Sequence, residues 1–531
     1  MSSEKFYPVD IPGVRLIGPQ KWIDSFPPNI PCGEYQKLYA SVFESFIEAL
    51  PSRHIDPEIY YSAVSNYKVI PQITQHLYEI VSLKKIRENG YEYVAGKEPV
   101  KIEEILDVKK RKISIDTDIF ELKGIDRLRE RWRAVRTNFG RACMFCAFFP
   151  GMVNYRHYII GDRSQKELIQ YVHEATVHPV CLRPLLFFMG SSKYRLQESD
   201  RSKIESFSNS FFEKLSARCS LTDGLLDQSF KDQFLELLSN SLKALKTCQK
   251  RIKSWNIKEE LLVTHIGNVH HRIFASAWNT LGGKVVGFSH GNIYPYAYVP
   301  GDILNGAFQI YDRFIVASEG EKRLLEYAQK DFKFGFRNNI EFATYKNSIY
   351  NPIFKEFQKA DSVKEIKKVM YVGFPTDYNN YSYSAEINTM TYVSLEIRIM
   401  KDLKKAGYYI IYKAHPDTLS QTRDLYAPFC DEIITEKFEN VWRKADCVFF
   451  GVPYSTTFGY TLMTNRPVVL MDLKTNYWHP SVYPLLKQRC AIVNMKLQDG
   501  GKLDYDSAEI AKAVEKSKNN ISYELIKKFA L

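Results

Sequence analysis

Two patterns of apolar and polar residues divide the chain. Over the first 240 residues, apolar side chains recur every three or four positions, the spacing of one face of an amphipathic helix. The clearest helical stretches are 34–50, 127–136, 202–218 and 229–253. From Leu261 onward, short apolar runs alternate with helical stretches, and this alternation predicts a parallel α/β sheet.

The α/β pattern occurs in two runs separated by a polar stretch, 331–352, which we interpret as a linker. We therefore expect an α/β protein with two Rossmann-like domains facing a cleft and a helix-rich N-terminal part. The expected domains are 1–345 on the acceptor side (helix-rich over 1–255, α/β over 256–330, then the linker) and 346–531 for nucleotide-sugar binding. The expected strands are 261–264, 285–288 and 313–317 in the first run, and 368–373, 408–412, 432–435, 447–451 and 468–471 in the second.

Length and composition agree with this organisation. The chain has 531 residues, more than the roughly 250–300 that one hydrophobic core usually serves. Its 45% hydrophobic and 25% charged residues exclude disordered, collagen-like and coiled-coil proteins. No run approaches the roughly 18–20 consecutive apolar residues of a membrane span, and an odd number of cysteines, nine, fits a reducing compartment. The expected location is cytoplasmic.

The net charge of +12 favours an anionic partner. The basic clusters 109–112 and 127–141 come without zinc-finger spacing, a ribonucleoprotein signature or Gly/Arg repeats, so nucleic acid is not expected. A phosphorylated ligand or an anionic membrane surface fits the charge better. Peripheral contact with the inner face of the cell membrane is compatible with the cytoplasmic location.

Two segments that follow predicted strands carry groups suited to phosphate. Lys413-Ala-His415-Pro416 follows the strand at 408–412, and both Lys413 and His415 can donate charge-assisted hydrogen bonds. Ser455, Thr456 and Thr457 follow the strand at 447–451 and open a helix, whose N-terminal amides favour anions. The structural alternatives are a histidine held in a turn and simple N-capping, but capping needs only one of three adjacent hydroxyls.

This pair of segments resembles the donor half of GT-B glycosyltransferases, above all the bacterial sialyltransferases and Kdo transferases that use CMP-activated sugars. Those families bind the donor phosphate with a His-Pro motif and a Ser-Ser or Ser-Thr motif. The resemblance implies these roles for His415-Pro416 and Ser455-Thr456, to which we add Lys413 and Thr457 on chemical grounds. CDP-glycerol glycerophosphotransferases and other capsule enzymes are also similar. Three further features carry this wider resemblance: Ser289-His290-Gly291, Asn351-Pro352 and Ala445-Asp446. The resemblance covers residues 261–518.

The sialyltransferase acidic motif (Asp/Glu-Asp/Glu-Gly) is not visible in the sequence, so the catalytic base is sought elsewhere. A base needs a pKa near the working pH, and we rank His290 first, because it ends a predicted strand before a glycine, and His265 next. A core or substrate-orienting histidine is the structural alternative. Asp302 and Glu319 are the carboxylate alternatives, and retaining transfer through a covalent carboxylate adduct stays open. On the acceptor side, the candidates are Asn292, Tyr294 and Tyr296.

No convincing metal site accompanies these residues. His265, His270 and His271 lack a cysteine or carboxylate to complete a ligand set, and Cys143 and Cys146 lie in an apolar run. The resemblance therefore implies metal-independent transfer of a sialic-acid-like sugar or Kdo from a CMP-activated donor, with no other cofactor. The acceptor would be a surface glycan of capsule or O-antigen type, free or lipid-linked.

Three alternatives remain beside this expectation. They are a CDP-glycerol-type glycerophosphotransferase, an epimerase-like GT-B enzyme, and a non-catalytic basic scaffold that binds membranes or nucleic acid.

Overall fold

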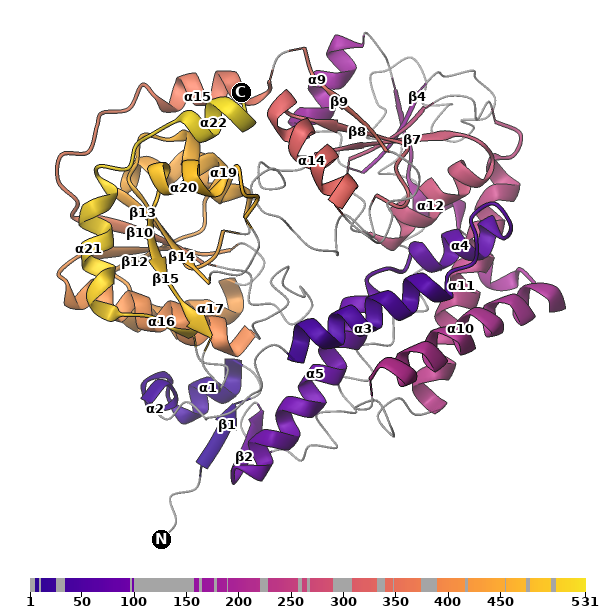
Figure 1. The fold of residues 1–531 in the computed structure, drawn as a ribbon, viewed down its shortest axis with the longest axis horizontal. Helices are drawn as coiled ribbons and strands as arrows, with labels where there is room; N and C mark the ends of the chain where they lie inside the picture. Colours follow the sequence, from indigo (N-terminus) through magenta and orange to yellow (C-terminus); the bar gives the residue numbers. More distant parts are fainter. Residues whose placement is uncertain are drawn as a thin grey trace.

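The chain forms two six-stranded parallel sheets, each with helices on both faces (Figure 1). This architecture comes from a computed structural model. It describes residues 5–8, 11–24, 34–95, 98–99, 157–161, 165–175, 179–188, 190–219, 228–255, 260–264, 268–289, 308–331, 340–346, 348–373, 389–415, 419–453, 455–473, 478–497 and 503–531. An α/β protein with two parallel sheets, compatible with two Rossmann-like domains, is thus confirmed.

The C-terminal unit (348–531) has the strand order β12-β11-β10-β13-β14-β15. Numbered along the chain, this order is 3-2-1-4-5-6, and every pair is parallel. Burial on both faces explains why these strands appear in the sequence as continuous apolar runs. The strands are β10 (Lys368–Val372), β11 (Tyr409–Lys413), β12 (Glu432–Ile434), β13 (Cys447–Phe450), β14 (Val468–Asp472) and β15 (Ala491–Asn494).

Helices cover the two faces of this sheet. One face packs against α16 (Thr389–Lys405), α17 (Leu419–Tyr426) and α21 (Ser507–Ser517). The other packs against α15 (Tyr350–Phe357), α18 (Phe438–Val441), α19 (Thr456–Met463), α20 (Tyr483–Arg489) and α22 (Glu524–Phe529). Short elements complete the unit: η7 (Ala427–Phe429), η8 (Trp442–Lys444), β16 (Lys496–Leu497) and β17 (Leu503–Asp504).

The N-terminal unit (34–346) contains the second sheet, in the order β5-β4-β6-β7-β8-β9. All its pairs are parallel. The helices α9 (Lys166–Glu174), α12 (Val269–Thr280) and α14 (Glu319–Asp331) connect the strands. The strands are β4 (His157–Ile160), β5 (Val180–Cys181), β6 (Glu260–Val263), β7 (Lys284–Phe288), β8 (Arg313–Val316) and β9 (Glu341–Thr344).

Three of these strands correct the sequence-based expectations. β4 and β5 lie in the part expected to be only helix-rich, and β9 lies in the stretch 331–352 expected to be a linker. All three strands have four residues or fewer, too short to show a periodicity against their polar surroundings. The first unit therefore takes its sheet from both sides of a long helical insertion.

A layer of helices packs against the α12 side of this sheet in one continuous core. Its helices agree with the stretches predicted at 34–50, 202–218 and 229–253, whereas 127–136 lies outside the described residues. The layer contains α3 (Glu34–Ala49), α4 (Pro57–Val64), α5 (Val69–Glu88), η3 (Pro184–Phe187), η4 (Ser191–Lys193), α10 (Glu198–Arg218) and α11 (Gln228–Ile252). Within the part of the chain that the structure describes, every helix is too short or too polar to span a bilayer.

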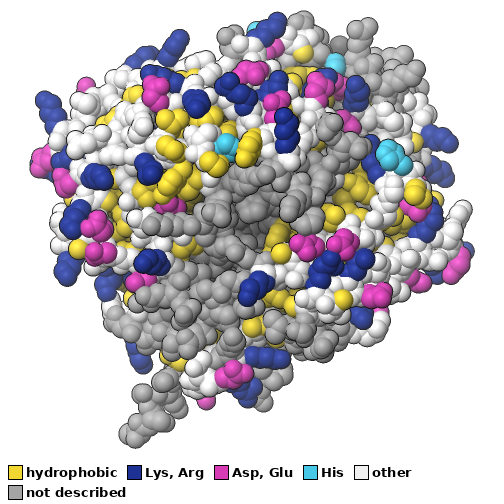
Figure 2. Space-filling view, viewed as in Figure 1, with side chains coloured by type: hydrophobic (Ala, Val, Ile, Leu, Met, Phe, Trp, Pro, Cys, Tyr) yellow, Lys and Arg dark blue, Asp and Glu magenta, His cyan; other side chains and the backbone are white. Residues whose placement is uncertain are grey.

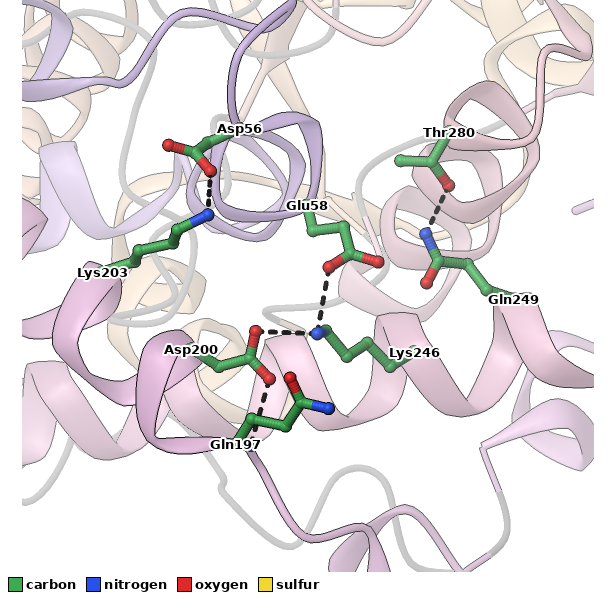
Figure 3. Close-up of polar contacts among 8 residues, drawn as sticks. All are labelled: Asp56, Glu58, Gln197, Asp200, Lys203, Lys246, Gln249 and Thr280. Carbon is green, nitrogen blue, oxygen red and sulfur yellow. Dashed lines mark hydrogen bonds and ion pairs between the residues drawn. The ribbon is translucent and has the colours of Figure 1, made fainter.

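A polar network ties the helices of this layer together (Figure 3). Lys246 of α11 lies 2.8 Å from Asp200 of α10 and 3.0 Å from Glu58 of α4, and its side chain is 14% exposed. Burial alone would lower the pKa of Lys246, but the hydrogen bonds with both carboxylates outweigh burial and raise it. Nearby, Lys203 pairs with Asp56. A second link joins α11 to α12, where Gln249 donates to Thr280 at 2.7 Å.

Both ends of the chain contribute to contacts between the two units (Figure 1). Val14 of α1 (Ile11–Ile17), with Trp22 and Ile23 of α2 (Pro19–Asp24), joins the core of the C-terminal sheet. At the other end, Ser318 of the N-terminal unit donates to the Phe529 carbonyl at 2.6 Å. A small sheet of β1 (Lys5–Pro8), β2 (Tyr91–Ala95) and β3 (Glu98–Pro99) links α1 back to α5.

Candidate functional site

Within the C-terminal unit, the strand order shows where the candidate site lies. Chain direction across this sheet reverses between β10 and β13, and open α/β sheets bind ligands at the carboxyl ends of the strands at such a switch point. Val372 of β10 pairs with Lys413 of β11 on one side and with Phe450 of β13 on the other. The segments after Lys413 and Phe450 therefore leave the same edge, on either side of β10.

The first of these segments contains Lys413 and His415. Lys413 is 7% exposed, and its ammonium donates to the Ala414 carbonyl at 2.8 Å. Burial lowers the pKa of Lys413, although Glu436 and Glu439 oppose this shift. His415 is half-buried. A ligand at the edge can touch His415, while the Lys413 charge acts from below.

The second segment begins α19. Ser455 is extended and caps the helix, accepting a hydrogen bond from the Phe458 amide at 3.2 Å. The amides of Thr456 and Thr457 belong to the first turn, where no carbonyl of the same helix can accept from them. Both threonines are half-buried. Capping thus accounts for Ser455 and leaves the two threonines for another role.

Neighbouring strands lie about 4.8 Å apart, so the two segments emerge roughly 10 Å from each other across β10. This spacing suits a ligand that holds one charged group between them. The sheet therefore brings Lys413, His415 and the hydroxyls of 455–457 to one edge, as the sequence analysis supposed, and their roles in donor binding stay predictions.

Tyrosines fill the sheet directly below this edge. A Cβ built on Gly373 would lie 2.2 Å from the Tyr412 hydroxyl, and one built on Gly451 would lie 2.3 Å from the Tyr371 hydroxyl. The two rings are stacked with centroids 6.2 Å apart. The first residues after β10 and β13 are glycines because these phenols occupy the space of a side chain.

The carboxyl edge of the N-terminal sheet has the opposite chemistry. Glu321 of α14 is 1% exposed and accepts from the Ser289 hydroxyl at 2.5 Å and from the Ala317 amide at 2.7 Å. Burial raises the pKa of Glu321 to about 7, a rise that the two hydrogen bonds oppose and nearby Glu167 reinforces. Glu321 therefore holds a proton in the pH range in which a general base operates.

Sequence reasoning missed Glu321 and chose its neighbour Glu319 as the fallback carboxylate. Glu319 is exposed in the first turn of α14 and accepts from the Thr344 hydroxyl at 2.9 Å. It lies at the expected edge, and its catalytic role stays a prediction. The polar run Glu319-Gly320-Glu321-Lys322-Arg323 carries no signal that only its third residue turns inward.

Several predicted site residues lie outside the described residues. They are the base candidates His290, His265 and Asp302, the acceptor-side candidates Asn292, Tyr294 and Tyr296, and the donor-side Pro416.

The helices that begin at these two carboxyl edges meet across the units. Lys166, in the first turn of α9, lies over the Tyr460 ring of α19, with its nitrogen 5.6 Å from the ring centroid. Tyr327 of α14 packs edge-on against His479 of the C-terminal unit, with centroids 4.7 Å apart. The first turn of α9, next to β4, thus faces the helix that carries Ser455–Thr457.

Among the described residues, no group of three or more His, Cys, Asp or Glu side chains is arranged to hold a metal ion. The described cysteines are all buried: Cys181, Cys219, Cys248, Cys430, Cys447 and Cys490.

Searches of protein-family models and of the curated proteins find no match to this chain.

Proposed function

We propose that this protein is a GT-B-type glycosyltransferase that moves an acidic sugar from a CMP-activated donor to a glycan acceptor. One observation carries the proposal. Two segments rich in groups that can donate hydrogen bonds to a phosphate, Lys413–His415 and Ser455–Thr457, leave the same carboxyl edge of one parallel sheet on either side of its switch point.

The donor side would work by electrostatic stabilisation. As the sugar leaves, negative charge grows on the phosphate of CMP. Hydrogen-bond donors that are held in place before the reaction stabilise such a charge without reorganising. His415 and the first turn of α19 would supply hydrogen bonds, and Lys413 would supply charge from below. The geometry supports a phosphate, whereas the choice of CMP comes from the resemblance of the two motifs.

The N-terminal unit would bring the acceptor and the base. Its carboxyl edge holds Glu319 and the proton-holding Glu321, and His290 follows Ser289 in the chain. On the face shown in Figure 2, Asp and Glu side chains lie among the Lys and Arg side chains of the described residues. The basic clusters 109–112 and 127–141, on which the scaffold alternative depends, lie outside the described residues.

Calorimetric binding of CMP tests the proposal. His415→Ala should weaken CMP binding at least about tenfold, because a hydrogen bond to a charged group contributes roughly 1.5–3 kcal/mol. Thr456→Val with Thr457→Val should also weaken it while keeping the Ser455 cap. His173→Ala, an exposed histidine of α9, is the matched control and should bind as the wild type does.

The outcomes separate the candidate functions. Binding of CMP in preference to UDP and CDP-glycerol supports the proposal. Preference for CDP-glycerol would indicate instead that the site belongs to a glycerophosphotransferase. Wild-type affinity in the His415 and threonine variants would refute the site.

A further inference from the structure

A buried arginine holds the far end of the helix that begins at the candidate phosphate site. Arg489 ends α20 and is 0% exposed. Its Nε donates to the Leu462 carbonyl at 2.9 Å. One terminal nitrogen, Nη2, donates to three carbonyls, those of Thr461 at 3.1 Å, Thr464 at 2.8 Å and Arg466 at 3.0 Å.

These carbonyls form the C-terminal end of α19. Thr461 and Leu462 belong to its last turn and Thr464 is its C-cap, so one guanidinium binds several carbonyls at the end where a helix lacks amide donors. The Thr461 carbonyl also accepts from the Thr464 hydroxyl at 2.7 Å. The other terminal nitrogen, Nη1, donates to the Asn520 carbonyl at 3.4 Å, which connects α19 to the chain after α21. The planar guanidinium, whose donors point in fixed directions, therefore fixes both the axial position and the rotation of this short helix.

Each acceptor of Arg489 among the described residues is a backbone carbonyl. The groups that act electrostatically on the guanidinium are Cys490, Tyr523 and Cys447, and burial lowers its pKa. Arg489 therefore supplies these buried carbonyls with hydrogen bonds and adds a positive charge that none of these acceptors neutralises.

The other end of α19 is the candidate phosphate site. The helix has eight residues and a length of about 12 Å, and its first turn presents the amides and hydroxyls of Thr456 and Thr457. A cation at the C-terminus stabilises the helix dipole, whose positive end points at the candidate phosphate. Over this distance of about 12 Å, and with an effective dielectric constant near 20, attraction between the guanidinium and the phosphate would raise the affinity for the phosphate about tenfold.

We infer that Arg489 is a positioning residue for the phosphate site. Through α19 it aligns the helix N-terminus and makes the electrostatic potential there more positive, without touching the ligand. The inference rests on the proposed function, since it specifies how the same site obtains its affinity for the phosphate group.

The test compares CMP with cytidine, which carries the same base and ribose but no phosphate. The ratio of their dissociation constants isolates the phosphate contribution from a general loss of the nucleoside pocket. Arg489→Met removes both the positive charge and the hydrogen bonds of the guanidinium. Arg489→Lys keeps the charge but loses the planar set of hydrogen-bond donors. Arg398→Met is the matched control, because Arg398, a partly buried arginine of this unit, also donates to a backbone carbonyl, that of Leu503, on the opposite face of the sheet.

We expect the CMP preference over cytidine to fall about tenfold in Arg489→Met and about threefold in Arg489→Lys, and to stay at the wild-type value in Arg398→Met. If Arg489→Met does not fold, the lysine variant decides. An unchanged preference in the Arg489 variants, or equal weakening of CMP and cytidine, would overturn the inference and leave the proposed function standing. A wild-type protein with no preference for CMP over cytidine would overturn both.

Discussion

The two sheets of this protein share one architecture but differ in the chemistry of their carboxyl edges. The C-terminal edge carries a lysine, a histidine and three hydroxyls around the switch point between β10 and β13. The N-terminal edge carries Glu319 in the first turn of α14 and, below it, Glu321 bonded to Ser289. Groups that donate hydrogen bonds to an anion thus gather on one unit, and carboxyl groups gather on the other.

The difference suggests a division of labour. A transferase must stabilise the anion that leaves and remove a proton from the group that attacks, and one local environment serves both poorly, because each charge shifts the pKa of the other. Placing the two tasks on separate sheets keeps the environments apart. The following variants test this comparison, starting with the largest expected effect.

Lys246→Met tests whether the helical layer belongs energetically to the N-terminal unit. Removing the ammonium leaves the side chain of Asp200, 11% exposed, without its ion pair. Loss of one partner from a buried pair costs roughly 3–5 kcal/mol, so we expect destabilisation of about 4 kcal/mol in denaturant unfolding. Lys203→Met is the control at an ion pair whose lysine side chain is 52% exposed, where the loss should stay below about 1 kcal/mol. Equal effects of the two variants would contradict this account.

Glu321→Gln tests the acidic edge. Because burial raises the pKa of Glu321 to about 7, the folded protein holds a proton that the unfolded chain has already released above about pH 4.5. Stability should therefore fall as pH rises from about 5 to 7, by about 3 kcal/mol, and this contribution should be constant above pH 7. Glutamine mimics the protonated acid, so the variant should lack this dependence.

Melting temperatures between pH 5 and 8 measure the effect. The wild type should lose several degrees over this range relative to Glu321→Gln. Glu319→Gln, which changes an exposed carboxylate in the same turn, should follow the wild type. Parallel curves for all three proteins would show that Glu321 does not titrate in this range.

Gly320→Ala tests the contact between the units. A Cβ at this position would lie 2.1 Å from the Lys528 carbonyl oxygen and 2.6 Å from the Phe529 Cα. Backbone atoms cannot rotate away, so the C-terminal segment must shift, with a loss of about 2 kcal/mol. Thermal unfolding and limited proteolysis of the C-terminal segment would show this. Lys330→Ala, at an exposed position of the same helix, should leave both measurements unchanged.

Ser455→Ala is expected to have the smallest effect on stability, about 1 kcal/mol from loss of the helix cap. Asp506→Ala removes the comparable cap of α21, where Asp506 accepts from the Ala508 amide at 2.9 Å. Both variants should melt at similar temperatures, but only Ser455→Ala should also weaken CMP binding. Equal CMP affinity in the two would remove Ser455 from the donor side.

The same contrast between units appears in what the sequence predicts. In the C-terminal unit, five of the six strands follow from their apolar runs, and the helix α16 ends as expected before Gly407, whose φ is +90°. The strand β15 (Ala491–Asn494) was not predicted, because it lies at the edge of the sheet, is only partly buried and ends in a polar residue. Continuous burial makes most of these strands easy to recognise.

The N-terminal sheet is harder to predict because its parts are short and distant in sequence. β4 and β6 are paired neighbours, yet nearly one hundred residues separate Ile160 from Leu261. Local periodicity cannot reveal such a pairing. Glu321 and Arg489 escape prediction for a related reason, since their burial depends on segments that meet only in the folded chain.

The packing of the N-terminal segment on the C-terminal sheet has a consequence for synthesis of the protein. Trp22 and Ile23 emerge early from the ribosome, but the sheet that buries them is complete only when residues near 514 have been made. At about 5–20 residues per second, these side chains wait on the order of half a minute or longer for their partners. The early part of the nascent chain therefore depends on a late one, and chaperone capacity during translation should influence the yield of folded protein more than the stability of the finished fold does.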